Sequence, residues 1–507
     1  MTRPWTSTAG VEIPDLVPAR LRREWAAAGR YPDKDLYRLF TEHADTHPDR
    51  AAVIDETGTV TYAELDRLVI AAAETMAGAN LGPRDIIGIR VRNGRLGAVA
   101  ELAAAALGAV SMPFPPGHGS RDARSLLRRS RATALVGDPG AHPRTITLTP
   151  HHPSGARPRP TIDPDSPARI LVSSGSETEP KMVAYSHNAF AGGRAAYVRA
   201  LHHDDTPMRN LVLVPLSSSF GSCGVPVTVA ALGATLITQP RFDPADALRL
   251  IHEHRPTHVF GVPTMLDRLA ARTTARPPGL RALVASGAAL PPATRRRCAA
   301  AFGVPVISVY GSTDGVNCHD ATTARPDPAV ATIVVTDADG TPLPPGTPGE
   351  IRALGPMTPL SYVADPALNT RHRTPDGWVR TGDQGILDER GVLHVTGRLR
   401  PTVIRGGRTI SPAEVELVLA DHPAVQEATC VAVPDLELGE RLCACVVPRP
   451  GRPHPTLTDL TTYLRLRHDL EPAKLPERLL VLDALPLGPT GKVCRTTLTE
   501  LATEAPV

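Results

Sequence analysis

Residues 86–108 read IIGIRVRNGRLGAVAELAAAALG, and this stretch decides the fold. The run IIGIRV has the apolar, β-branched character of a buried strand, whereas residues 95–108 have the apolar spacing of a helix. The same alternation continues with LVLVPL at 211–216, ATLIT at 234–238 and a helical pattern over 244–254. Strands and helices that alternate along most of a chain predict an α/β architecture.

After Gly397 the sequence changes to a compact pattern of strands and helices. A glycine turn at 406–407 precedes a helix, two apolar strands at 428–433 and 441–447, and another helix. We therefore expect a large N-terminal α/β domain of several subdomains over 1–399, and a small, mobile α+β domain over 400–507. The Pro- and His-rich segment 140–168 is expected to cross the surface between two subdomains.

Two short strings predict where helices begin. In the string Thr61-Tyr-Ala-Glu64, and again in Ser411-Pro-Ala-Glu414, a hydroxyl residue stands three positions before a glutamate. This is the pattern of a capping box, in which each side chain bonds the other residue's backbone N–H. We expect helices to start just after Thr61 and just after Ser411.

Composition excludes several classes of protein. The chain has 507 residues, 42% of them hydrophobic, and its 55 basic and 52 acidic residues give a formal charge of +3. No block of like charge predicts a nucleic-acid interface, and no apolar run predicts a membrane span or a secretion signal. The seven cysteines form no CxxC pair, so Cys443 and Cys445 are expected to be buried thiols in a cytoplasmic protein.

Lysine is rare in this chain. It occurs only at Lys34, Lys181, Lys474 and Lys492, while the other 51 basic residues of the 55 are arginine. Because an ammonium group differs from a guanidinium in geometry and hydration, a retained lysine indicates a position where a point charge is needed. Lys474, in EPAKLPERLL, is expected to be solvated or structural.

The string LVSSGSETEPK at 171–181 is a candidate phosphate loop. Small residues let backbone N–H groups approach a triphosphate, hydroxyls donate hydrogen bonds, and an ammonium neutralises charge. The spacing is not that of a Walker loop. The candidate residues are Ser173, Ser174, Gly175, Ser176 and Lys181.

Four further strings follow in order: VYGSTDG at 309–315, RTGD at 380–383, GRLRPTVIRGGRTISPAEVE at 397–416 and LPLGPTGKVCR at 485–495. Together with the candidate phosphate loop, they resemble the adenylate-forming superfamily of acyl-CoA synthetases, peptide-synthetase adenylation domains and luciferases. Within it, the chain is most similar to stand-alone aryl-acid AMP ligases of the 2,3-dihydroxybenzoate and salicylate type. The resemblance covers residues from about 35 to about 495.

This resemblance implies a nucleotide site. Asp383 matches the aspartate that binds the ribose hydroxyls, and Arg398 matches an arginine that contacts the nucleotide. The expected adenine slot is formed by Ser286, Gly287, Ala288, Tyr310 and Gly311.

The resemblance also implies the reacting groups. Thr313 matches the hydroxyl residue that meets the α-phosphate, and Lys492 matches the lysine that bridges the substrate carboxylate and that phosphate during adenylation. A fixed cation there offsets the repulsion between two anions. Asp314 stands where relatives usually have a Mg²⁺-binding glutamate and is one methylene shorter.

The sequence departs from the family pattern at several positions. Glu177 and Thr178 replace the usual Thr-Gly pair of the phosphate loop. Ser218 replaces a common histidine, and Ser219 replaces the asparagine of dihydroxybenzoate ligases or the aspartate of amino-acid-activating domains. Without an acidic residue there, an α-amino acid is not the expected substrate. The expected acid-binding residues are Ser218, Ser219, Phe220, Cys223, Gly261, Val262, Ser286 and Val316.

The function implied is ATP- and Mg²⁺-dependent activation of a substituted benzoate, such as salicylate, anthranilate or a hydroxyanthranilate, as aryl-AMP. The aryl group then passes to CoA or to the phosphopantetheine of an aryl carrier protein supplied in trans. Three alternatives remain open: an amide- or ester-forming ligase, a fatty- or alkyl-acid CoA ligase, and a nucleotide-binding pseudoenzyme.

The resemblance places an interdomain hinge at Arg400, which Pro401 follows. Proline disfavours the helical backbone region for the residue before it. We therefore expect one of two hinge states to be favoured.

Overall fold

The strand expected at 86–91 is β5 (Ile86–Arg90), and the helix after it is α4 (Arg95–Ala106), in the computed structural model of the chain. The α/β class is thereby confirmed. The structure describes residues 4–117, 120–137, 142–149, 151–173, 180–203, 206–273, 275–288, 290–318, 325–399, 401–486 and 493–505.

The chain divides into two compact units. The first comprises residues 1–116, 127–172 and 182–397, and the second comprises residues 117–126, 173–181 and 398–507. Each unit is described separately below.

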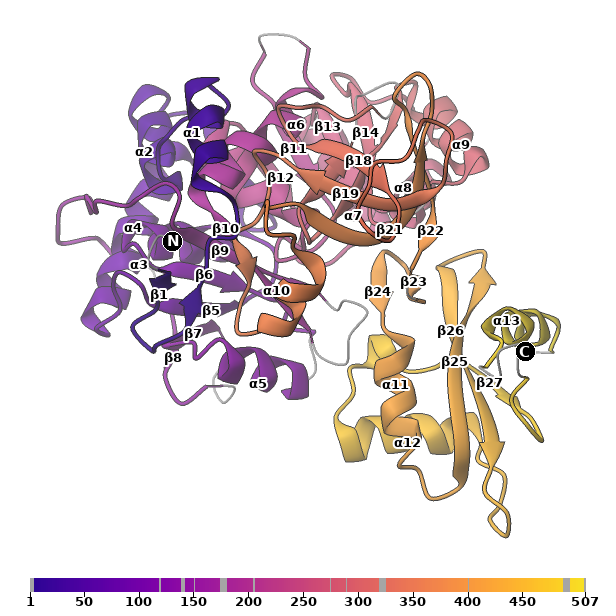
Figure 1. Cartoon of the computed structure of the whole chain (residues 1–507). Coiled ribbons are helices and arrows are strands. Elements are labelled where there is room, and N and C mark those ends of the chain that lie inside the picture. Colours follow the sequence, from indigo (N-terminus) through magenta and orange to yellow (C-terminus); the bar gives the residue numbers. More distant parts are fainter. Residues whose placement is uncertain are drawn as a thin grey trace. The chain divides into compact units, whose positions relative to one another are not determined.

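Two seven-stranded sheets form the frame of the first unit (Figure 1). One has the order β20 (Ser361–Tyr362), β10 (Lys181–Ser186), β9 (Pro167–Ser173), β6 (Val110–Pro113), β5, β7 (Ala134–Gly137) and β8 (Thr145–Ile146). The other has the order β15 (Val306–Ser308), β14 (Ala282–Ala285), β13 (His258–Gly261), β11 (Arg209–Val212), β12 (Thr235–Thr238), β3 (Ala51–Asp55) and β4 (Gly58–Thr61).

The parallel strands of the second sheet, β15 to β3, are buried on both faces, whereas the edge strand β4 pairs antiparallel with β3 and is partly exposed. Phe260 and Val284 point to the main core, and their neighbours Val259 and Leu283 point to a separate apolar cluster on the other face. The helices that contribute to this second cluster are α7 (Pro244–His254), α8 (Pro263–Ala270) and α9 (Pro292–Phe302).

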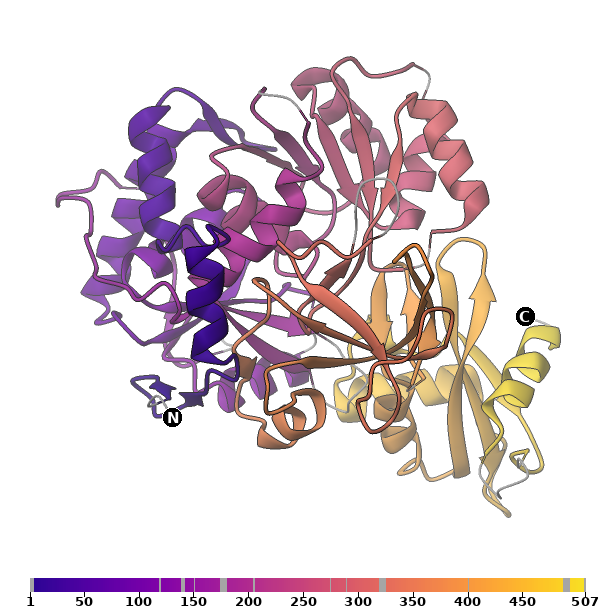
Figure 2. The same cartoon turned by 45° about the horizontal axis from the view of Figure 1, so that its top comes forward.

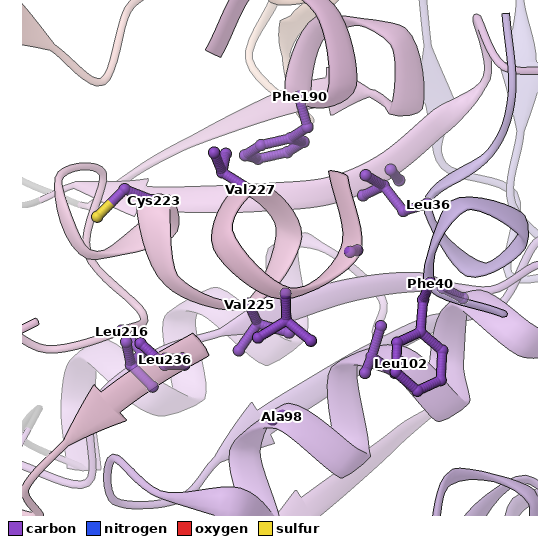
Figure 3. Packing of buried hydrophobic residues seen from close by; sticks show 14 of the residues in the cluster. Leu36, Phe40, Ala98, Leu102, Phe190, Leu216, Cys223, Val225, Val227 and Leu236 are labelled. Atoms are coloured by element: carbon purple, nitrogen blue, oxygen red, sulfur yellow. The ribbon is translucent and has the colours of Figure 1, made fainter. Parts of the chain in front are cut away.

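The main core is built around the apolar π-helical segment η3 (Gly224–Ala231). Figure 3 shows Val225 and Val227 of η3 among side chains from α2 (Leu36–Thr46) and α4, with Phe190 nearby. Other helical segments of this unit are α1 (Ala19–Ala27), α3 (Tyr62–Gly78), η1 (Ala189–Arg194), α6 (Ala195–Arg199), η2 (Gly221–Cys223) and α10 (Pro366–His372). Helix α5 (Ser120–Arg129) belongs in part to each unit.

A third sheet of the first unit has the order β18 (Thr332–Thr336), β19 (Gly349–Leu354), β21 (Val379–Leu387) and β22 (Leu393–Arg398). The hairpin of β16 (Tyr310–Ser312) and β17 (Val316–Cys318) precedes it in the chain, and a short pair of β1 (Trp5–Thr6) and β2 (Glu12–Ile13) opens the chain.

The second unit has a sheet of its own, built on the long hairpin of β25 (Val425–Asp435) and β26 (Gly439–Pro448), with α13 (Arg495–Glu504) alongside (Figure 2). The remaining strands are β23 (Val403–Arg405), β24 (Arg408–Ile410) and β27 (Arg478–Val481), and the other helical segments are α11 (Pro412–Leu419), α12 (Leu457–His468) and η4 (Pro472–Lys474). Cys443 and Cys445 are buried free thiols in β26, as expected.

One sequence expectation in this unit is wrong in its details. Helix α11 does begin after Ser411, but the Ser411 side chain makes no capping bond. Its partner Glu414 instead accepts a hydrogen bond from Lys474 Nζ at 2.9 Å. Lys474 is buried and therefore structural rather than solvated. The capping box of Thr61 and Glu64, by contrast, has both of its reciprocal bonds.

Candidate functional site

The predicted binding residues of the first unit follow neighbouring parallel strands. The segment Pro215–Gly224, here called the acid segment, comes after β11. Gly261 ends β13 and Val262 follows it, Ser286–Ala288 follow β14, and Tyr310 follows β15. In open parallel sheets, ligands bind outside the carboxyl ends of the strands. These residues therefore converge on one edge although they are far apart in the sequence.

The turn of the β16–β17 hairpin carries Thr313 and Asp314. Gly315 in this turn has φ +104°, and a side chain on it would come within 2.2 Å of the Pro359 ring. Glycine is therefore required for the hairpin to close against its neighbour.

Two phenols hold this turn. Tyr185 Oη donates to the Thr313 carbonyl oxygen at 2.8 Å, and Tyr362 Oη donates to Asp314 Oδ1 at 2.6 Å. Burial raises the pKa of both tyrosines, so the phenols keep their protons and can act as donors. The hairpin turn is thus fixed from two sides.

Asp383 lies in β21 and is buried. Its Oδ2 accepts a hydrogen bond from Tyr310 Oη at 2.7 Å, and its backbone N–H donates to Thr381 Oγ1 at 3.1 Å. The structure therefore brings the predicted ribose residue and a predicted adenine residue together, although 73 positions separate them.

The acid segment is folded tightly on itself. A side chain at Gly221 would meet the Pro215 carbonyl oxygen at 1.9 Å, so only glycine fits there. The Ser218 hydroxyl donates to that same carbonyl and accepts from the Gly221 N–H, at 2.7 and 2.9 Å. Ser218 therefore acts mainly on its own turn.

Ser219, Phe220 and Cys223 have different surroundings. Ser219 Oγ accepts from Arg194 Nη2 at 3.3 Å, and the Phe220 ring lies 5.9 Å from the Phe260 ring, centroid to centroid. Cys223 is buried, and desolvation raises the pKa of its thiol to about 12. Cys223 is therefore a neutral, buried thiol rather than a nucleophile.

Three residues that contact the predicted site were not identified from the sequence: Tyr185, Arg194 and Tyr362. Their contacts join segments far apart in the chain, which a local pattern does not reveal. Arg194 alone left a signal, because it is the one charged residue in the otherwise apolar stretch 189–198. A lone charge in a buried helical pattern predicts a specific partner.

The remaining predicted residues are located by their place in the chain. Ser174, Gly175, Ser176, Lys492 and Arg400 lie outside the described residues. Ser173, Lys181 and Arg398 belong to the second unit, and Lys181 is buried at the start of β10. Gly311 and Val316 are strand residues of the β16–β17 hairpin, at the positions facing Asn317 and Ser312.

The chemistry around Asp314 suits Mg²⁺. A carboxylate oxygen is the type of ligand that this hard cation prefers, and Mg²⁺ is commonly held by one or two carboxylates together with substrate phosphates. Within the described ranges, no group of three His, Cys, Asp or Glu side chains forms a complete metal cage. The single carboxylate of Asp314 could take part in a Mg²⁺ site that substrate phosphates complete.

Comparison with known proteins agrees with this geometry. Residues 40–363 match the family profile described as AMP-binding enzyme, and residues 414–492 match the AMP-binding enzyme C-terminal domain. The chain is 31% identical to a salicyl-AMP ligase / salicyl-S-ArCP synthetase of Mycobacterium tuberculosis, over 94% of this chain and 92% of that protein. It is 28% identical to a salicylyl-CoA synthase / salicylate adenylyltransferase of a Streptomyces species, over 96% of both chains.

Among solved structures, the amide bond synthetase McbA from Marinactinospora thermotolerans superposes with a TM-score of 0.82 at 27% identity, over 92% of this chain and 99% of that one. In the part of the chain that the structure describes, no helix has the length and apolar character needed to cross a membrane.

Proposed function

Because the chain belongs to the AMP-binding enzyme family and is an adenylate-forming ligase, we propose that it activates a substituted benzoic acid as its aryl-AMP and then transfers the aryl group to a thiol. A carboxylate oxygen of the acid attacks the α-phosphorus of ATP, and pyrophosphate leaves. The thiol sulfur then attacks the acyl carbon, and AMP leaves. The first candidate acids are salicylate, anthranilate and hydroxyanthranilate.

The observation that carries this proposal is the placement of three groups in the first unit. Tyr310 and the acid segment follow parallel strands of the same sheet, Tyr310 donates a hydrogen bond to Asp383 of β21, and Tyr185 holds the hairpin turn that carries Thr313 and Asp314. Asp383 would accept hydrogen bonds from the ribose hydroxyls, since a buried carboxylate is a strong acceptor. Thr313 would donate to the α-phosphate.

The remaining roles rest on chemistry and on the family resemblance. Asp314 would hold Mg²⁺, which supplies positive charge against the phosphates when it is bound. Lys492 would approach the reacting carboxylate and the α-phosphate, where its charge offsets their repulsion. Ser286, Gly287 and Ala288 would leave room for the flat adenine base.

The acid segment favours an aryl acid over an α-amino acid. Ser219 supplies no negative charge for an α-ammonium group, and the Phe220 ring, which packs against Phe260, would offer an apolar surface to a flat substrate. The matched mycobacterial ligase, whose name specifies salicyl-AMP, supports the same substrate class.

The acceptor has two candidates. The thiol of CoA or of a carrier-protein phosphopantetheine is favoured by the names of the salicylate-activating relatives. An amine is the second candidate, because a solved amide bond synthetase superposes on nearly the whole chain. In that case nitrogen instead of sulfur attacks the acyl carbon.

The test is acid-dependent exchange of radiolabelled pyrophosphate into ATP, with a panel of benzoates, fatty acids and amino acids. We expect exchange with substituted benzoates and a loss of about 100-fold or more in kcat for Lys492→Ala. Mass spectrometry of products formed with CoA, a phosphopantetheinylated carrier or an amine then identifies the acceptor. Exchange with fatty acids alone, or with no acid at all, would contradict the proposal.

A further inference from the structure

Arg194 is a buried cation beside the acid segment. It is the last residue of η1 and is only 2% exposed. Its Nη1 donates to the Ser219 carbonyl at 3.1 Å and to Ser222 Oγ at 3.0 Å, and its Nη2 donates to Tyr185 Oη at 3.0 Å and to Ser219 Oγ at 3.3 Å. The guanidinium carbon lies 4.5 Å from the centre of the Tyr185 ring. All of these partners are neutral.

Arg169 has the kind of partner that Arg194 lacks, a carboxylate. Arg169, equally buried in β9, is paired with Glu101 of α4, with Nη1 2.7 Å from Oε2. Among the described residues, no carboxylate plays this part for Arg194. Because a buried unpaired charge is strongly unfavourable, a group that is absent from the chain itself is expected to supply the negative charge.

A purely structural role is a weaker explanation for Arg194. Arg373 is also buried without a carboxylate, and it donates to three backbone carbonyls, those of Pro359, Leu360 and Gly377. Such an arginine fastens loops.

Arg194 instead reaches one backbone carbonyl and three side-chain hydroxyls. The Tyr185 and Ser222 hydroxyls donate to the carbonyls of Thr313 and Ser219. The Ser219 hydroxyl, by contrast, has no acceptor among the described residues and can rotate to receive a ligand.

Elsewhere in this chain, arginines bind carboxylates through the edge of the guanidinium that carries Nε and Nη2. Arg95 holds Asp55 through Nε and Nη2, and Arg157 holds Asp66 through the same pair of nitrogens. In Arg194, Nη2 donates to the Tyr185 and Ser219 hydroxyls. Its Nε is buried without a hydrogen-bond partner among the described residues, as is the Nε of Arg169 and of Arg373. Arg194 differs from those two arginines because, within the described ranges, it has neither a carboxylate partner nor three backbone carbonyls. Side-on binding of a carboxylate would satisfy Nε and pair the charge at once.

The group that pairs with Arg194 has to keep its negative charge throughout the reaction. The carboxylate that attacks ATP becomes the acyl part of a mixed anhydride with the α-phosphate, and its oxygens then no longer carry the carboxylate charge. It would therefore leave Arg194 unpaired at the step where the intermediate must be held. A second carboxylate on the ring keeps its charge in the acid, the adenylate and the product. It would stabilise all three states alike.

Building on the proposed function, we propose that the substrate is an aromatic dicarboxylic acid, whose second carboxylate is bound by Arg194 next to Ser219. This group takes the place of the neutral hydroxyl or amine of salicylate or anthranilate. Arg194 has only donors to offer, so an oxygen anion fits this position and an ammonium or amine does not. Arg194 is then a specificity-determining residue of the acid site.

The first test uses the wild-type enzyme and pyrophosphate exchange with benzoate, salicylate, anthranilate, phthalate and isophthalate. We expect a dicarboxylate to give the highest kcat/KM. If monocarboxylic benzoates exchange well and every dicarboxylate is poorer than benzoate, the assignment of Arg194 is wrong while the proposed function stands. If only aliphatic dicarboxylates exchange, the aryl proposal fails and the role of Arg194 stands.

The second test compares Arg194→Met with Arg199→Met, which removes an exposed arginine in the next turn of the same helical stretch. We expect Arg194→Met to lower kcat/KM for the dicarboxylate by about 30-fold or more relative to benzoate, and Arg199→Met to leave this ratio unchanged. An equal loss on both acids would assign Arg194 to structure alone. Arg194→Lys, which keeps the charge, should retain part of the preference and guards against a folding defect in the methionine variant.

Discussion

Asp383 shows how a single carboxylate is prepared for a ligand. It is buried in β21 and accepts from the Tyr310 phenol at 2.7 Å, so its orientation is set before a nucleotide binds. Preorganised groups lose little entropy when they bind. If Asp383 binds ribose, its contribution is the same in the ground state and in the transition state, because the ribose takes no part in the chemistry.

Replacing this carboxylate therefore gives a defined kinetic result. Asp383→Ala should raise the KM for ATP by roughly 10-fold to 100-fold, the cost of losing charge-assisted hydrogen bonds, with a much smaller change in kcat. Tyr310→Phe, which removes only the phenol oxygen, is the matched control and should raise KM less. Steady-state kinetics with ATP varied at saturating acid makes the measurement, and a loss confined to kcat would contradict the ribose role.

Single residues were predictable from the sequence where their neighbours form a recognisable string. Thr313, Asp314 and Asp383 belong to such strings, and the structure brings Asp383 into contact with Tyr310, another predicted residue. Tyr362 could not be found in this way, because its role is defined by Asp314, which is 48 positions away. Arg194 left only the indirect signal of a charge among apolar neighbours.

At the scale of elements, a buried histidine supports the start of helix α2. Asp35 caps this helix by accepting from the Arg38 N–H at 2.9 Å, and His187 Nδ1 accepts from the Leu36 N–H at 3.2 Å. The first N–H groups of a helix have no partner within it, so both contacts satisfy otherwise unpaired donors. Burial lowers the pKa of His187 to about 3, which keeps its imidazole neutral and able to accept.

This histidine makes stability depend on pH in a defined direction. The imidazole takes up a proton near pH 6.5 in the unfolded chain but only near pH 3 in the folded one, so acidification favours the unfolded state. The contribution of His187 is complete above pH 6.5 and is lost as the pH falls. Between pH 7 and pH 5 this amounts to about 2 kcal/mol in the free energy of unfolding.

His187→Asn, which can keep the acceptor, should remove this part of the pH dependence. Urea unfolding at pH 7 and pH 5 measures it, and the wild type should lose about 2 kcal/mol more than the variant. His454→Asn, at an exposed position, is the control and should follow the wild type. Parallel pH profiles for wild type and His187→Asn would show that the imidazole is not kept neutral by the fold.

Helix caps were predicted correctly where residues near each other in the sequence determine them, and less well where a buried residue from elsewhere in the chain competes for a partner. The Thr61 capping box formed because both of its partners are near the surface of the same helix end. At Ser411 the same pattern failed, because the buried ammonium of Lys474 is a stronger partner for Glu414 than a backbone N–H. The competing lysine is 60 positions away, beyond what a local pattern can weigh.

At the scale of the whole molecule, the alternation of strands and helices predicted the class but not the order of the strands. Strand β12 pairs with β3 through Ile237 and Ile54, although these two residues are far apart in the sequence. Any of several parallel orders would satisfy the same hydrophobic pattern, since every central strand is apolar on both faces. The order is decided by how the connecting helices pack, and this is information that no single segment carries.

The two-unit organisation makes the segment around Pro401 the place to test coupling between activation and transfer. The first unit ends at Gly397, and Pro401 is exposed. Proline disfavours the helical backbone region for the residue before it, so we expect Pro401 to bias an equilibrium between two domain states by about 1 kcal/mol. If each half-reaction uses a different domain state, as the family resemblance implies, this bias would act on the two half-reactions in opposite directions.

Pro401→Asp should therefore change the ratio of the adenylation rate to the acyl-transfer rate by several-fold, while the melting temperature stays nearly constant. The melting temperature is insensitive because the substituted side chain is exposed and makes no contribution to either core. Pro453→Asp, at another exposed proline of the second unit, controls for the general effect of losing a proline and adding a charge. Stopped-flow measurement of both half-reactions gives the ratio of the adenylation rate to the acyl-transfer rate. Equal ratios in wild type and Pro401→Asp would mean that Pro401 does not control the rotation. A ratio that changes in Pro401→Asp and not in Pro453→Asp would place the control of the reaction cycle at the Arg400–Pro401 peptide.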